Sequence, residues 1–113
     1  MAEQVSVFIE NKPGRLNAVT GVLAEARIDI RAMTIADHRD YGVVKLLVSD
    51  PGAAQKALVE HGFAAALKPV LAVAIEDRSG GLHELLEILA EHQLNVRDAC
   101  GFVGEPGRRA VWC

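Results

Sequence analysis

The residues best suited to bind a small ligand lie in two short segments with the same order of features. The first, IENKPGRL, covers residues 9–16, and the second, IEDRSGGL, covers residues 75–82. In each, an apolar strand pattern runs into a polar turn with glycine and then into a helical pattern. A helix N-terminus offers free N–H groups and a partial positive charge to a carboxylate, and Asn11 or Asp77 could accept a hydrogen bond from an ammonium group. A zwitterionic amino acid needs this combination of donors and acceptor.

A nucleotide-phosphate loop fits these two glycine corners poorly. A P-loop needs four residues between its glycines followed by Gly-Lys-Ser/Thr, and a dinucleotide fingerprint needs Gly-x-Gly-x-x-Gly. The segment KPGRLN has one glycine and RSGGLH has two adjacent ones, so neither motif is present. A single corner of this kind is equally well explained as a structural turn, because glycine permits backbone conformations that other residues resist. The structural turn and the small-ligand site both stay open.

Catalytic and metal-binding chemistry find no support in the spacing of the residues. The histidines are not spaced as metal ligands, and a metal site needs three or four convergent ligands. No arrangement of serine, histidine and aspartate, and no pair of carboxylates, stands out as catalytic. We therefore expect no catalytic residue, no metal site and no cofactor. The four histidines are His38, His61, His83 and His92.

The composition is that of a globular protein, since half of the 113 residues are hydrophobic and 24% are charged. A formal net charge of −3 disfavours nucleic acids and anionic membranes as partners, because both require a basic surface. No apolar run reaches the roughly 18 residues of a membrane span, and the N-terminus lacks the pattern of a secretory signal. We expect a soluble cytoplasmic protein. Cys100 and Cys113 fall on strands of a predicted hairpin and could face each other, although reduced thiols are favoured in the cytosol.

Periodicity predicts six elements in the first part of the chain, residues 1–68. Alternating polar and apolar residues favour strands, and apolar residues at three- and four-residue spacing favour a helix. Asp50 is a suitable N-cap before Pro51, and Gly62 suits the end of that helix. The predicted elements are a strand at 4–9, a helix at 14–27, strands at 28–36 and 43–48, a helix that begins at 51, and an alanine-rich strand at 63–67.

The order βαββαβ is that of the ferredoxin-like α+β fold, an antiparallel sheet with its helices on one face. After residue 68 the sequence begins again, because an offset of 66 residues aligns Ile9 with Ile75 and Gly14 with Gly80. The second copy, residues 69–113, is predicted as a partial βαββ repeat without the last helix and strand. Its predicted elements are a strand at 70–75, a helix at 80–92, a strand at 94–103, a turn at 104–107 and a strand at 109–113.

The shortened second copy has a physical consequence. The apolar sheet face that a second helix would cover is expected to be bare, and one strand edge is expected to lack its neighbour. A half-covered sheet of this size is marginal alone. We therefore expect a homodimer or a higher oligomer.

Two long segments, ENKPGRLNAVTGVLAEARIDIRAM and EDRSGGLHELLEILAEHQLNVRDA, resemble the ACT domain, the regulatory amino-acid-binding module of many biosynthetic enzymes. The shared features are an acidic or amide residue, a glycine, an apolar helix ending in Leu-Ala and an Ile-Asn-Ile-like entry to the next strand. The resemblance implies a tandem, non-catalytic, allosteric module whose ligand is a small amino acid or similar metabolite. Ligand binding would then act on a partner enzyme or on the oligomer itself.

The resemblance further implies that the ligand lies between a glycine corner and the start of the second strand of a neighbouring domain. Copy two departs from the family pattern at Ser79, where proline is frequent. The implied ligand-binding residues are Asn11, Gly14, Arg15 and Leu16 in the first corner, Asp77, Gly80, Gly81 and Leu82 in the second, and Asp29, Ile30, Asn95 and Val96 at the second strands.

Other functions for this architecture remain as alternatives. The chain could be an assembly subunit that binds a biosynthetic enzyme through its sheet edges and has no ligand of its own. An acylphosphatase-type enzyme would need an arginine-bearing phosphate loop, for which Arg15 lies in a suitable corner, but the duplication would be unexplained. An RNA-recognition domain would display aromatic residues on its central strands, and an aromatic content of 4% cannot supply two such surfaces.

Overall fold

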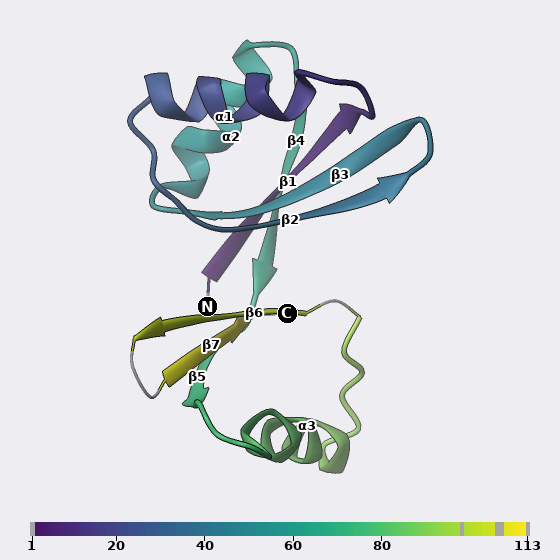
Figure 1. The fold of residues 1–113 in the computed structure, drawn as a ribbon, viewed down its shortest axis with the longest axis vertical. Coiled ribbons are helices and arrows are strands. Elements are labelled where there is room, and N and C mark those ends of the chain that lie inside the picture. Colours follow the sequence, from purple (N-terminus) through teal and green to yellow (C-terminus); the bar gives the residue numbers. More distant parts are fainter. Residues whose placement is uncertain (1, 98, 106–107, 113) are drawn as a thin grey trace. The chain divides into compact units, whose positions relative to one another are not determined.

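The chain folds into two compact units. The computed structural model describes residues 2–97, 99–105 and 108–112, with side chains described as far as residue 101 except at residue 98. The first unit is Glu3–Pro69, and the second comprises the residues from Val70 on together with Ala2. The first unit has a four-stranded sheet and two helices, and the described part of the second has a three-stranded sheet and one helix (Figure 1).

The first unit has the predicted βαββαβ order and confirms the ferredoxin-like α+β fold. Its four strands lie in the order β2-β3-β1-β4, and both helices lie on one face of the sheet (Figure 1). β3 is antiparallel to both of its neighbours. The elements are β1 (Ala2–Glu10), α1 (Arg15–Glu25), β2 (Ile30–His38), β3 (Tyr41–Val48), α2 (Pro51–Glu60) and β4 (Ala64–Val70).

One apolar cluster fills the space between the helices and the sheet of this unit. Alternate residues of β1 and β3 point to the same face, and the three- and four-residue spacing in α1 and α2 aims their apolar residues back at it. Asp50 caps α2 as predicted, because its Oδ1 accepts from the Ala53 N–H at 3.1 Å. The buried cluster comprises Val5, Val7, Ile9, Val19, Val22, Leu23, Ile28, Val44, Leu46, Val48, Ala54 and Leu58.

The alanine-rich segment near residue 65 forms β4, although alanine favours helices. Ala65 and Leu67 are half-buried and pack against the apolar cluster. The gain from pairing with β1 and from this contact outweighs the local preference, as is common for strands. The prediction of a strand from context is therefore confirmed.

The edge strand β2 is only partly covered by the helices. Met33 pairs with Leu46 and Ile35 with Val44, so both side chains point to the face of the apolar cluster. They are nevertheless 42% and 53% exposed. The helices therefore cover the middle of the sheet better than its β2 edge.

The second unit is a three-stranded sheet with one helix among the described residues. The strands lie in the order β5-β7-β6, and β7 is antiparallel to both neighbours, as β3 is in the first unit. This arrangement agrees with a partial βαββ repeat. The elements are β5 (Ala72–Glu76), α3 (Gly81–Glu91), β6 (Cys100–Glu105) and β7 (Arg108–Trp112).

The prediction of a strand at 94–103 is wrong at its start, because β6 begins only at Cys100. In the first unit the corresponding strand begins at Ile30, which pairs with Val48 near the end of β3. In the second unit β7 as described ends at Trp112, which pairs with Cys100. Residues 94–97 and 99, the described ones directly before Cys100, therefore have no partner strand and no regular structure.

Two predictions concern residues outside the described part of the chain. The predicted turn at 104–107 is wrong at its start, because β6 continues to Glu105, and residues 106–107 are not described. Cys100 is a free, half-buried thiol, whereas Cys113, its conceivable partner, lies outside the described residues. Across the described chain, no helix is both long and apolar enough to cross a membrane.

Burial predicts the stability effect of two substitutions in the first unit. Leu58 of α2 is fully buried, so Leu58→Ala should lower the free energy of unfolding by about 2–5 kcal/mol through lost burial and a cavity. Ile35→Ala, at a half-exposed position on β2, should cost less than about 1 kcal/mol. Urea unfolding followed by circular dichroism measures both, and equal losses would contradict this assignment of the core.

Candidate functional site

Both predicted glycine corners are present and have the same backbone geometry. Gly14 before α1 has φ 87° and Gly80 before α3 has φ 84°, both in the left-handed region that favours glycine. Each glycine C=O accepts the first helical hydrogen bond at 3.0 Å, from Ala18 and Glu84 respectively. The corner recurs at the predicted offset of 66 residues.

The first corner leaves N–H groups free at the start of α1. The helix has no side-chain cap among the described residues, and the Arg15 N–H is bound at 3.3 Å to the Lys12 C=O. The N–H groups of Leu16 and Asn17 have no acceptor in the described part of the chain. These donors, together with the helix dipole, suit a carboxylate.

Asn11 connects the first corner to the tip of the β2–β3 hairpin through three hydrogen bonds. Its N–H donates to the Asp40 C=O at 3.0 Å, and its Nδ2 donates to Asp37 Oδ1 at 2.9 Å and to the Arg39 C=O at 2.8 Å. Asp37 Oδ1 also accepts from the Arg39 N–H at 2.9 Å, in a turn where Arg39 has φ 67°. Both Nδ2 donors of Asn11 are used, and its Oδ1 has no donor among the described residues.

The hairpin tip belongs to this site but was not predicted from the sequence. Pairing of Glu10 with Tyr41 puts the end of β1 beside the turn, so Asp37 and Arg39 lie next to Asn11. His38 and Tyr41, across the turn, stack with ring centroids 5.1 Å apart. The register of β1 and β3 is the signal that shows this neighbourhood, because the predicted strands at 28–36 and 43–48 place a turn between them.

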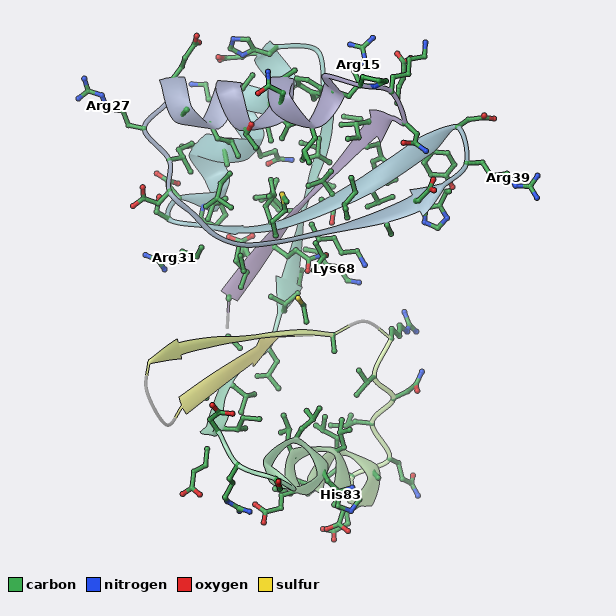
Figure 2. The ribbon with its side chains drawn as sticks, in the orientation of Figure 1. Arg15, Arg27, Arg31, Arg39, Lys68 and His83 are labelled. Carbon is green, nitrogen blue, oxygen red and sulfur yellow. The ribbon has the colours of Figure 1, made fainter. Side chains whose placement is uncertain are left out.

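The charges of the first corner centre on one carboxylate. Glu10 lies 2.9 Å from Lys12 Nζ and 3.3 Å from Arg15 Nη2. The hydrogen bond and charge of Lys12, and then the charge of Arg15, lower the pKa of Glu10. Arg15 projects outward at the start of α1 (Figure 2) and remains about half exposed. Two cations therefore share a single anion here.

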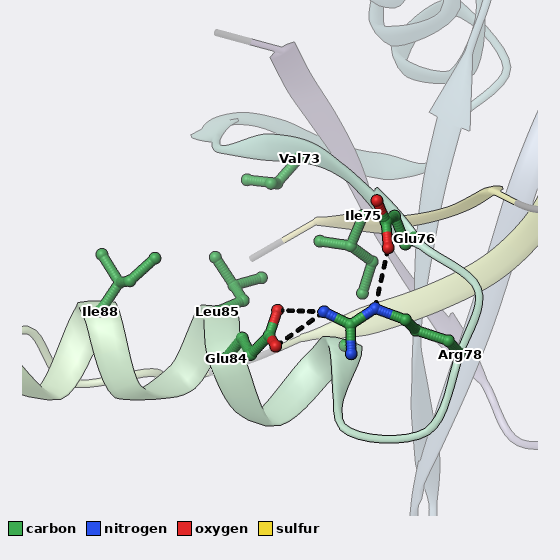
Figure 3. Close-up of a pocket in the computed structure, with 8 residues that line it drawn as sticks. Val73, Ile75, Glu76, Arg78, Glu84, Leu85 and Ile88 are labelled. Atoms are coloured by element: carbon green, nitrogen blue, oxygen red, sulfur yellow. Dashed lines mark hydrogen bonds and ion pairs between the residues drawn. The ribbon is translucent and has the colours of Figure 1, made fainter.

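The second corner has the opposite balance of charges, with more carboxylates than cations in its ion-pair cluster. Arg78 donates through Nε to Glu76 at 2.8 Å and through Nη2 to both Glu84 oxygens at 2.7 and 2.6 Å (Figure 3). These hydrogen bonds raise the pKa of Arg78, and the bond from Arg78 lowers the pKa of Glu84. One cation is shared by two anions, and its donors are largely used.

A second difference lies at Gly81, where copy one has Arg15. A Cβ on Gly81 would lie 2.6 Å from the Glu76 carbonyl oxygen, which is too close for any side chain. In the first corner, by contrast, the equivalent position carries the full side chain of Arg15. The second corner thus brings helix and strand closer together and could not hold an arginine at the position of Arg15.

The remaining predicted residues do not join either corner within a unit. Ile30 pairs with Val48, at the opposite end of the sheet from Glu10 and Tyr41. Asp29 is tied to Ser49 there by two hydrogen bonds of 2.9 and 3.0 Å. Asn95 and Val96 were predicted at the start of a strand, and they lie instead in a segment without regular structure after α3.

A hollow of about 310 Å³ lies beside the second corner, between β5 and α3 (Figure 3). Its floor is apolar and its rim is the Arg78 ion-pair cluster. Of the predicted site residues it includes only Gly81; Asp77, Gly80 and Leu82 are not part of its lining. The lining residues are Val73, Ile75, Glu76, Arg78, Gly81, Glu84, Leu85 and Ile88. In the described chain, no three His, Cys, Asp or Glu side chains gather as metal ligands.

Comparison with known proteins identifies the family. The model of the family described as "ACT domain pair" matches residues 1–108 of this chain. The chain therefore belongs to the family of ACT domain pairs, which are regulatory modules. Comparison with curated protein sequences gave no significant match.

Solved structures with the same fold include one well-matched relative. A protein from Bacteroides thetaiotaomicron is 34% identical with a TM-score of 0.93, over 98% of this chain and 76% of that one. The ligand-free regulatory subunit of aspartate kinase from Thermus thermophilus has 21% identity and a TM-score of 0.71, over 97% and 80%. The corresponding subunit from Thermus flavus has 19% identity and a TM-score of 0.65, over 97% and 80%. At these identities the two Thermus proteins show the fold alone.

Two glycines in the first corner and its helix should respond oppositely to alanine. Gly14→Ala should lower the free energy of unfolding by about 1–2 kcal/mol, because only the left-handed backbone resists the new Cβ. Gly21→Ala, in the middle of α1 with open space around it, should raise stability by about 0.5–1 kcal/mol. Denaturant unfolding tests both, and a stabilising Gly14→Ala would contradict the left-handed cap.

The Arg78 cluster predicts a change in the pKa of Glu84. In Arg78→Met, the pKa of Glu84 should rise towards its ordinary value, whereas the lowered pKa of Glu10 should not change. Because the pKa of Glu84 is lower in the folded than in the unfolded state, its pairing stabilises the fold above the unfolded pKa and is lost as pH falls through the folded one. Carboxyl-carbon NMR titration measures both groups; an unchanged pKa of Glu84 would rule out Arg78 as the cause of its lowering.

Proposed function

We propose that this chain is a non-catalytic, cytoplasmic regulatory module that binds a small amino acid at its first glycine corner. The observation that carries the proposal is the orientation of Asn11. The hairpin tip occupies both Nδ2 donors, so Asn11 Oδ1 is available as an acceptor beside a helix start with free N–H groups. Family membership as an ACT domain pair supports a regulatory role for such a site.

The carboxylate of the ligand would bind at the start of α1. The Leu16 and Asn17 N–H groups supply two donors, and the helix dipole adds partial positive charge. Among the described residues, the Arg15 guanidinium forms one ion pair, a 3.3 Å contact with Glu10, which Lys12 also neutralises at 2.9 Å. Arg15 can therefore turn towards a ligand carboxylate without leaving Glu10 unpaired.

The ammonium group would be accepted by Asn11 Oδ1. A neutral amide accepts a hydrogen bond from an ammonium group without requiring burial of a second full charge. The three hydrogen bonds from Asn11 to the hairpin fix the direction of this oxygen before any ligand arrives. Such preorganisation reduces the entropy lost on binding.

The second corner is a weaker candidate for the same ligand. Its arginine already serves two carboxylates, so a ligand carboxylate would have to compete with Glu76 and Glu84. Asp77, at the position of Asn11, can only accept hydrogen bonds when ionised. We assign the ligand to the first corner and a structural role to the Arg78 cluster.

The first corner is open on its outer side, because Asn11, Gly14 and Arg15 are all exposed. A small polar ligand held on one exposed surface would compete poorly with water. A second wall from a neighbouring subunit would enclose it, and the start of β2 with Asp29 and Ile30 is the proposed wall. The module would then be a homodimer or a higher oligomer with the ligand at its domain interface.

Regulation would follow from linkage between ligand and assembly. A ligand that contacts both sides of an interface stabilises the arrangement that forms it, and the binding of a partner enzyme changes by the same coupling free energy. The structural similarity to regulatory subunits of aspartate kinase supports a partner enzyme as the receiver. The competing proposal, a subunit that only assembles an enzyme, rests on the exposed apolar residues of the second unit.

Calorimetric titration with the twenty amino acids tests the site. At least one should bind with release of heat, and Arg15→Ala should weaken it by about tenfold or more through loss of a charge-assisted hydrogen bond. Lys56→Ala removes an exposed cation from α2 and should leave binding unchanged. If no amino acid binds the folded protein at millimolar concentration, the assembly role without a ligand is favoured instead.

A further inference from the structure

The side-chain amide of Asn11 has one orientation, because both neighbours of its Nδ2 can only accept hydrogen bonds. Nδ2 lies 2.9 Å from Asp37 Oδ1 and 2.8 Å from the Arg39 C=O. If Nδ2 and Oδ1 exchanged places, Asn11 Oδ1 would face these two oxygens with no proton between them. The hairpin tip therefore determines that an acceptor, and not a donor, remains available at the first corner.

Asp37 supports both of these contacts. Its Oδ1 accepts from Asn11 Nδ2 and also from the Arg39 N–H at 2.9 Å. The second bond holds Arg39 in a left-handed backbone with φ 67°, a conformation that residues with a Cβ resist. The Arg39 side chain points away from the corner (Figure 2), so its backbone C=O is the group that meets Asn11. Loss of Asp37 would thus remove one acceptor of Asn11 and loosen the turn that presents the other.

We propose that Asp37 is the positioning residue through which the first corner distinguishes an amino acid from the α-keto acid of the same carbon skeleton. The inference rests on the proposed function, since it concerns the amino-acid site at Asn11. The ligand class is narrowed to compounds that carry an ammonium group on the α-carbon. The module then responds to the product of an amination step and ignores the α-keto acid that this step consumes.

The discrimination depends on one hydrogen bond. Both compounds carry a carboxylate for the start of α1, so the helix alone does not separate them. An ammonium group donates to Asn11 Oδ1, whereas the carbonyl oxygen of an α-keto acid only accepts. With the α-keto acid, two acceptors would face each other and lose water without gaining a hydrogen bond. A flipped Asn11 amide would reverse the preference, because Nδ2 can donate to a carbonyl oxygen but not to an ammonium group.

Calorimetric titration of the whole protein tests the proposal with pairs of ligands. The probes are each amino acid that binds the wild-type protein and its α-keto acid, such as alanine with pyruvate or leucine with α-ketoisocaproate. Asp37→Ala removes the acceptor, and Asp37→Asn removes the charge but keeps an acceptor oxygen in the same place. Glu25→Gln removes one carboxylate charge from the last residue of α1, at the opposite end from the corner, and serves as the charge control.

The wild-type protein should bind the amino acid at least about tenfold more tightly than its α-keto acid. Asp37→Ala should weaken the amino acid by about fivefold or more, and the α-keto acid should bind as before or more tightly. A merely structural role of Asp37 would weaken both ligands together. Asp37→Asn and Glu25→Gln should each change the ratio of the two affinities by less than about threefold.

A measurement without ligand tests the contact itself. In ¹⁵N-labelled wild-type protein, the side-chain amide protons of Asn11 should exchange with water more slowly than those of Asn17, which is also exposed. Asp37→Ala should remove this protection, because it removes one acceptor and loosens the turn that holds the other. Equal exchange of the two amides in the wild-type protein would show that the orientation of Asn11 is not fixed.

Several results would overturn the proposal while the proposed function stands. They are equal wild-type affinity for the amino acid and its α-keto acid, an unchanged ratio of affinities in Asp37→Ala, and equal weakening of both ligands by that substitution. An Asp37→Asn variant as unselective as Asp37→Ala would assign the effect to charge and not to the orientation of Asn11. A wild-type protein that binds no amino acid would instead overturn the proposed function, and this proposal with it.

Discussion

The need to bury one apolar face of an antiparallel sheet governs both units of this protein. In such sheets one face packs on the core, and helices on that face supply the cover. In the first unit α1 and α2 together cover Val5, Val7, Val44 and Leu46, all of which are fully buried. In the second unit α3 is the one helix among the described residues, and its own Leu86 and Ile88 are 40% and 54% exposed. The first unit therefore has a closed core, whereas the described part of the second unit exposes apolar residues of its helix.

Strand register determines which side chains can form the candidate site. The antiparallel pairing of Glu10 with Tyr41 brings the end of β1 to the hairpin tip, and Asn11 then reaches three groups of that turn. The site is thus composed of a helix start and a hairpin whose linked residues, Asn11 and Asp37, are 26 positions apart in the sequence. The same register sends Asp29 and Ile30 to the far end of the sheet, where only another subunit or domain could use them.

Periodicity and the internal repeat were enough to predict the fold of the first unit, including the weak strand β4, because each local pattern agreed with its neighbours. The start of β6 could not be predicted in this way. Residues 94–99 repeat the strand pattern of 28–33, but a strand requires a partner, and partner positions are not encoded in the segment itself. The glycine corners were predictable from Gly14 and Gly80, whereas the roles of Asp37 and Arg78 depend on side-chain geometry that spacing does not specify.

Gly81 has a consequence for how the two copies have diverged. A Cβ on Gly81 would lie 2.6 Å from the Glu76 carbonyl oxygen, so the start of α3 can come this close to β5 only because Gly81 has no side chain. In the first copy Arg15 stands at the equivalent position, so the corner there has room for a side chain. Exchange of the two corner sequences would therefore fail in one direction, since an arginine could not enter the second corner without moving the backbone. The two duplicated segments are therefore no longer interchangeable, because the first corner accepts a side chain at this position and the second does not.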